Sequence, residues 1–117
     1  MSAGTHTITI EQGATFTSLM TWYTDDTRET PVNLTGYTAK MQIRSRIGDE
    51  TVLLELSTEN GRITLGGVAG TILLTISATD TEDLTFEQGV YDLELIDDGT
   101  VTRLLQGVVQ IQKEVTI

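Results

Sequence analysis

Apolar and polar residues alternate along most of the chain, which is the pattern of half-buried β-strands. Ile8 and Ile10 alternate with threonines near the start, and Tyr91, Leu93 and Leu95 alternate with acidic residues near the end. Turn-forming residues separate these runs. The alternating runs predict strands within residues 5–10, 15–23, 37–46, 52–56, 62–65 and 71–77, followed by a hairpin within residues 89–115.

Two dipeptides have the composition of tight hairpin turns. Asn60-Gly61 predicts a hairpin between the runs on either side of it, and Asp98-Gly99 predicts a second one. One short stretch is helical in character: Thr79 and Glu82 have the spacing of a capping box. We expect a single helical turn there, with Leu84 and Phe86 following it into the core.

The last run, from Val101 onward, predicts that six residues share one face of a strand: Val101, Arg103, Leu105, Gly107, Val109 and Ile111. The arginine among them indicates that this face is exposed to solvent where the strand begins.

About eight strands at roughly ten-residue spacing are typical of an antiparallel β-sandwich or barrel. The antibody pattern of two cysteines around a tryptophan is absent, although Trp22 shares a face with Phe16 and Met20 and could be a core tryptophan.

Composition agrees with one globular domain spanning residues 1–117. Apolar residues make up 38% of the chain, enough for one packed core. There are 22 threonines, which suit half-exposed strands, and one proline, Pro31. There is no cysteine, so core packing and sheet hydrogen bonds must hold the fold without disulfides.

The net charge of −10 excludes two classes of partner. Nucleic acids and anionic membrane surfaces both require a basic footprint, which this chain lacks. No apolar run is long enough to span a membrane, and the first residues lack the pattern of a signal peptide. We therefore expect synthesis in the cytoplasm.

Candidate chemistry is sparse, and we predict no catalytic residue, no cofactor and no enzyme activity. His6 is the only histidine, and no serine lies in a nucleophile elbow. The acidic pairs Asp25-Asp26 and Asp97-Asp98 could contribute to a calcium site, but turn propensity together with solubility is the favoured explanation, so we assign no metal ligand. Asn33-Leu34-Thr35 matches an N-glycosylation acceptor.

Interface residues are predicted at two places. Tyr23 has the opposite phase to Trp22 and is a candidate surface aromatic. The two ends of the chain are alternating and apolar, so they either pair with each other or present an open edge to another subunit. The candidate interface residues are Tyr23, Gln110, Ile111, Val115 and Ile117.

Four stretches in order, "ITIEQGATF", "TPVNLTGYTAKMQIR", "ENGRITLGG" with "GTILLTISATDTEDL", and "GVYDLELIDDGTVTRLLQGVV", span nearly the whole chain. Together they resemble small virion proteins of tailed bacteriophages and prophages, akin to the N-terminal domain of phage baseplate upper proteins. Asn33 departs from that family, which usually has an acidic residue before "LTGY".

The resemblance implies an all-β, immunoglobulin-like antiparallel β-sandwich of about eight strands with one short helical turn. It implies a virion structural protein, a tail, baseplate or fibre adaptor that acts by protein–protein assembly as a homo-oligomer. Capsid decoration, or a receptor- or carbohydrate-binding module on the virion, stays as the alternative. A protein made in a bacterial cytoplasm is not expected to carry a glycan at Asn33, so we interpret that stretch as structural.

Overall fold

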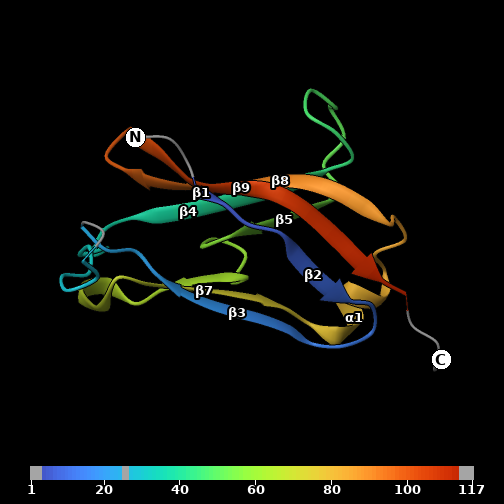
Figure 1. Ribbon diagram of the computed structural model, residues 1–117, viewed down its shortest axis with the longest axis horizontal. Helices are drawn as coiled ribbons and strands as arrows, with labels where there is room; N and C mark the ends of the chain where they lie inside the picture. Colours follow the sequence, from blue (N-terminus) through green and yellow to red (C-terminus); the bar gives the residue numbers. More distant parts are fainter. Residues whose placement is uncertain (1–3, 25–26, 114–117) are drawn as a thin grey trace.

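The computed structural model describes residues 4–24 and 27–113, which form two β-sheets packed face to face (Figure 1). The larger sheet has six strands in the order β1-β9-β8-β4-β5, and β2 also pairs with β9. Its strands are β1 (Gly4–Thr5), β2 (Ile8–Glu11), β4 (Thr38–Arg44), β5 (Leu54–Ser57), β8 (Gln88–Asp97) and β9 (Thr100–Gln112).

The smaller sheet has three antiparallel strands in the order β3-β7-β6. These are β3 (Phe16–Thr21), β7 (Thr71–Ile76) and β6 (Ile63–Leu65), with the short 3₁₀ helix η1 (Gly67–Ala69) between the last two in sequence. No helix among the described residues is long and apolar enough to cross a membrane.

The strand order is that of an immunoglobulin-like sandwich, so the predicted fold class is confirmed. β3, β7 and β6 take the places of strands B, E and D, while β4, β5, β8 and β9 take those of C, C′, F and G. One detail differs from the prediction: β1 and β2 run parallel to β9, whereas every other strand pair is antiparallel. The two chain ends therefore pair with each other.

The core lies between the sheets and consists of the inward-facing residues of both. Ala39, Met41 and Ile43 of β4 are buried, as are Leu93 and Leu95 of β8, which confirms the half-buried alternation predicted for these strands. The smaller sheet contributes three side chains of β7, and the N-terminal strand contributes two more: Ile72, Leu74, Ile76, Ile8 and Ile10. Trp22 packs against this core and meets Tyr37 edge to face at 6.2 Å.

The predicted hairpin at Asn60-Gly61 is wrong. β5 belongs to the larger sheet and β6 to the smaller one, so this turn carries the chain between layers. The Asn60 side chain accepts hydrogen bonds from the backbone N–H groups of Ser57 and Arg62 and donates to the Glu55 carbonyl. Those local bonds build a tight turn without strand pairing. The predicted hairpin at Asp98-Gly99 is confirmed, with positive φ at both residues.

A β-bulge corrects the predicted faces of β9. The register shifts between Leu93 and Glu94 of β8, so that Leu93 pairs with Leu105 while Glu94 pairs with Arg103. Leu104 is therefore an extra residue on β9, and the alternation of side chains reverses across it. Arg103 projects from the outer face, whereas Val109 and Ile111 lie in the core.

The helical turn is α1 (Ala78–Glu82), but its cap is not the predicted one. Ser77 is the N-cap residue and accepts a hydrogen bond from the Asp80 N–H, two residues before the expected Thr79. Thr81 is fully buried, accepts a hydrogen bond from Gly13 N–H and donates to the Ala14 carbonyl. This ties α1 to the turn between β2 and β3.

The stretch around Leu34 is structural, as predicted. Leu34 is buried, and the Asn33 side chain accepts a hydrogen bond from Thr35 N–H at 3.0 Å, which forms a local turn. Gly36 follows with φ of 85°, a conformation that favours glycine. The turn leads directly into β4.

Candidate functional site

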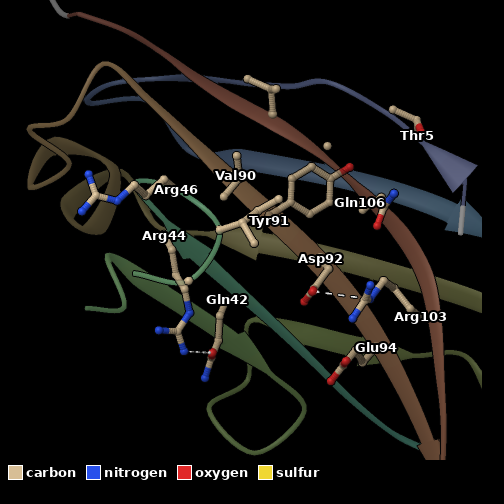
Figure 2. Close-up of a pocket in the computed structure, with 14 residues that line it drawn as sticks. Thr5, Gln42, Arg44, Arg46, Val90, Tyr91, Asp92, Glu94, Arg103 and Gln106 are labelled. Atoms are coloured by element: carbon tan, nitrogen blue, oxygen red, sulfur yellow. Dashed lines mark hydrogen bonds and ion pairs between the residues drawn. The ribbon is translucent and has the colours of Figure 1, made fainter. Parts of the chain in front are cut away.

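The outer face of the larger sheet carries the main hollow, with a volume of about 580 Å³ (Figure 2). Its floor consists of outward-facing side chains of β4, β8 and β9, and the loop after β4 forms one wall. Val90 and Val108 are paired across two strands and supply an apolar patch on the floor. Ile47, in the loop, is 91% exposed.

Polar residues form rows across this face because neighbouring strands place paired residues side by side. One row runs through Thr5, Gln106, Asp92, Gln42 and Glu55. A second row contains Arg103, Glu94 and Lys40. Arg103 pairs with Asp92 and Lys40 with Glu55, each at 3.5 Å and each largely exposed, so both pairs contribute little to stability.

Arg44 fixes the loop that walls the hollow. Its guanidinium donates to the Asp49 carbonyl at 2.5 Å and to the Gln42 side chain at 2.7 Å. The hydroxyl of Ser45 donates to the Asp49 carboxylate, and this bond, followed by the Thr51 N–H, holds the pKa of Asp49 below its usual value. Asp49 is therefore tied to the residues before it, Arg44 and Ser45, and to Thr51 after it, and these bonds hold the loop in place.

Tyr91 contacts the hollow from beneath and anchors the N-terminal segment. Its hydroxyl donates to the His6 carbonyl at 2.7 Å, and burial raises the pKa of Tyr91 to about 12. The phenol therefore stays protonated at neutral pH and serves as a hydrogen-bond donor. Gly107 lies opposite Tyr91, where an added Cβ would approach the His6 carbonyl oxygen to 2.2 Å.

The hollow is lined by amide, guanidinium and carboxylate side chains that can form hydrogen bonds to a bound molecule. His6 is exposed and uses its backbone, not its ring, in these contacts. Among the described residues, no cluster of three or more His, Cys, Asp or Glu could hold a metal ion. Of the acidic pairs considered for calcium, Asp97-Asp98 lies at the β8–β9 turn and Asp25-Asp26 falls outside the described residues.

The predicted interface residues do not gather in one place. Tyr23 is half-buried and its backbone pairs with Pro31, while Gln110 is exposed on the outer face of β9. Ile111 is only 8% exposed and belongs to the core, so its side chain is not available to a partner. Val115 and Ile117 lie outside the described residues.

Of the two alternatives for the chain ends, the described residues show the first, in which the N-terminal strands pair with the C-terminal strand. β9 is paired on one side with β8 and on the other with β1 and β2, up to Gln112. Deletion from Gln110 onward would remove the core residue Ile111 together with its pairing to Ile10. That strand is therefore part of the fold itself.

Sequence reasoning missed the outer face of the smaller sheet, which we call the threonine face. It bears no charged side chain, because the outward positions of all three strands are threonine or leucine. Leu19, on the edge strand β3, is 67% exposed and pairs with Leu73 of the central strand β7. Its residues are Thr17, Leu19, Thr21, Thr64, Thr71, Leu73 and Thr75. A repeated Thr-x-Leu-x-Thr pattern at 17–21 and 71–75 is the sequence feature that marks it.

β3 leaves the threonine face with an open edge. Thr75 donates its N–H to Arg62, and the Thr71 carbonyl accepts from Gly66, so these β7 residues direct their backbone groups away from β3. In an antiparallel ladder, the residues of β3 that lie opposite these β7 residues then direct their own N–H and C=O groups away from β7. The N–H and C=O groups of Thr17, Leu19 and Thr21 therefore face outward from the sheet edge.

Comparisons with known proteins identify no family: no family model matches the chain, and no curated protein matches it. Similar solved structures include the extracellular domain of the voltage-gated sodium channel beta4 subunit, at 16% identity and a TM-score of 0.46, over 98% of this chain and 97% of that one. Tim-1 is similar at 17% identity and a TM-score of 0.48, over 100% of this chain and 99% of that one. At these values the similarities carry no inference about partners or activity.

Proposed function

We propose that this chain is a structural domain of a tailed-bacteriophage virion, an adaptor in the tail, baseplate or fibre that acts by protein–protein assembly. The four stretches that resemble baseplate proteins support the virion assignment. Synthesis in the bacterial cytoplasm and incorporation into the particle follow from the same assignment. The surface of the domain supports action by binding.

The threonine face is the observation that carries assembly. A chain with a net charge of −10 repels its own copies, and surface charge normally keeps a monomer soluble. The strands of this face carry no charged side chain that would repel a second copy, and Leu19 exposes apolar area on the edge strand β3. Contact surfaces of protein complexes are depleted of charge at their centres in the same way.

The test is whether the chain is present in purified particles. Phage particles whose genome encodes this chain would be purified, separated into heads and tails, and analysed by quantitative mass spectrometry. We expect the chain in the tail fraction at a fixed stoichiometry to other tail proteins. Its presence only on heads would favour capsid decoration, and its absence from particles would contradict the proposal.

The hollow on the larger sheet favours a second candidate, a receptor- or carbohydrate-binding module. Gln42 and Arg44 of β4 and Gln106 of β9 line it with polar groups from two strands. Against a sugar site, the aromatic ring at the hollow, Tyr91, is only 5% exposed and so offers little stacking surface. A glycan array would decide: binding that is lost in Gln106→Ala, with the fold intact, would establish this function.

A further inference from the structure

We propose that the open edge of β3 pairs with β3 of a second copy, antiparallel, so that two three-stranded sheets join into one sheet across a two-fold axis. This inference rests on the proposed function, because it names the first partner in assembly as another copy of the chain. The surface involved is the edge of β3 together with the adjoining part of the threonine face.

The first step is that the edge is left open by the path of the N-terminal segment. In related sandwiches of the constant type, a first strand lies beside strand B and covers its edge. Here β1 and β2 both pair with β9 in the other sheet, and β3 pairs only with β7. Within residues 4–24 and 27–113, the backbone groups of Thr17, Leu19 and Thr21 thus face outward with no strand beside them.

The second step is that this edge lacks the features that block pairing. Natural edge strands carry charges, proline or bulges, or are very short. The six residues of β3 include no charge, proline or glycine. The other described edges differ: β5 contains Glu55, β2 contains Glu11, and β6 is three residues long.

The third step is that β3 is complementary to itself. With the two-fold axis at Leu19, the residue pairs across the axis are Leu19 with its own copy and Thr17 with Thr21. Each pair exchanges two backbone hydrogen bonds, because these residues already direct N–H and C=O groups outward. The two Leu19 side chains would then pack together on the threonine face and remove apolar surface from water.

Charge explains why the second copy would bind here and not elsewhere. Two chains of −10 repel each other over a screening length of about 8–10 Å at moderate salt. When two copies pair through β3, neither paired strand contains a carboxylate, so the repulsion between the copies is smallest at this edge. Added salt should therefore strengthen this dimer, whereas it would weaken a complex held by Arg44 and Arg103 on the larger sheet.

The experiment is sedimentation equilibrium of the full chain at low and high salt, with three variants. Leu19→Lys places two like charges at the axis and should raise the dimer dissociation constant roughly 30-fold or more, as expected at the centre of an interface. Thr17→Pro removes one outward N–H that β7 does not use, and should weaken the dimer at unchanged fold.

Thr64→Lys is the matched control. Thr64 lies on the threonine face but on β6, at the far side of β7 from the edge, so the edge-paired dimer should keep its wild-type dissociation constant. If Thr64→Lys abolishes association as Leu19→Lys does, the copies stack through the whole face and edge pairing is overturned. Circular dichroism and thermal melts of dilute samples would verify that all variants fold.

The proposal is overturned if the wild-type chain stays monomeric up to about 1 mM, because a dimer with a dissociation constant above that value would be too weak for a specific interface. It is equally overturned by a dimer that neither Leu19→Lys nor Thr17→Pro weakens, or by a dimer that salt dissociates. These outcomes leave the virion assignment intact if the chain is found in particles. A β3 dimer from a chain absent from particles would retain this inference and reject the proposed function.

Discussion

The outer faces of the two sheets differ in how they meet water. The face over β4, β8 and β9 carries rows of charged and amide side chains, among them Arg103, Asp92 and Lys40, around a hollow. The threonine face carries threonine and leucine alone. Both cover the same core, so the difference does not arise from the demands of folding. It indicates that the two faces meet different surroundings in the working protein.

The comparison also shows how one strand can change the role of a sheet. Because β1 and β2 join β9, the larger sheet gains a covered edge there, while the smaller sheet is left with the open edge of β3. Natural proteins protect such an edge with charge, proline, a bulge or a very short strand. The threonine face lacks that protection, which is why we assign assembly to it.

The largest expected effect comes from the shared core, where the two faces should respond alike. Leu74 lies beneath the threonine face and Leu93 beneath the hollow, and both are fully buried. Leu74→Ala and Leu93→Ala should each lower the free energy of unfolding by about 2–5 kcal/mol, through lost burial and a remaining cavity. Urea denaturation would measure both.

Thr75→Ala, on the outer side of the same strand as Leu74, is the control and should change stability by less than about 0.5 kcal/mol. A loss confined to Leu74→Ala or to Leu93→Ala would mean that the sheets do not unfold as one unit.

A smaller effect is expected where His6, between β1 and β2, approaches β9. Gly107→Ala should destabilise the fold by about 1–3 kcal/mol, because its Cβ would overlap the His6 carbonyl oxygen. Tyr91→Phe removes only the hydroxyl bond to the same carbonyl and should cost about 1 kcal/mol. Thermal melts would compare them, and a neutral Gly107→Ala would contradict the close approach.

Alkaline pH should weaken the larger sheet through Tyr91. Burial raises the pKa of its phenol to about 12, whereas an unfolded tyrosine has a pKa of about 10. The folded state therefore holds this proton more tightly. Its contribution to stability is complete below about pH 10 and is lost as the pH rises through about 12.

Chemical denaturation between pH 9 and about 12 would follow this loss. Tyr91→Phe should flatten the decline in that range. Equal slopes for the variant and the wild type would assign the alkaline loss to other groups.

The smallest effect is expected from the exposed charges of the larger sheet. Arg103→Gln removes the ion pair with Asp92, in which both side chains are largely exposed, and should change stability by about 0–1 kcal/mol. The same substitution should leave dimerisation at β3 unaltered. If Arg103→Gln abolished the dimer, the interface would have to be assigned to the outer face of the larger sheet, which carries the hollow.

Alternation alone predicts most of the fold, since Met41, Leu93 and Ile72 all face the core as expected. It fails where tertiary context decides. Asn60-Gly61 has the chemistry of a hairpin turn, but its strands enter different sheets. The extra residue Leu104 reverses the faces of β9, and no local pattern marks a bulge of this kind.

The candidate surfaces were harder to predict than the core. Which edge is open depends on which sheet the first strand joins, and that choice involves residues at opposite ends of the chain, such as Ile10 and Ile111. The sequence pattern therefore leaves open whether the chain ends pair with each other or present an edge, and it does not indicate the β3 edge. The alternation in the sequence predicts that the Leu19 side chain faces outward, but it does not indicate that the backbone N–H and C=O groups of Leu19 lie at an open edge.

Amide hydrogen exchange at two protein concentrations tests assembly through the β3 edge most directly. The N–H groups of Thr17, Leu19 and Thr21 face outward from a single copy and should exchange rapidly when the protein is dilute. When it is concentrated they should become protected, while the N–H groups of Ser18 and Met20, directed toward β7, stay protected throughout. Exchange at the three outward amides that is rapid at both concentrations would contradict the account.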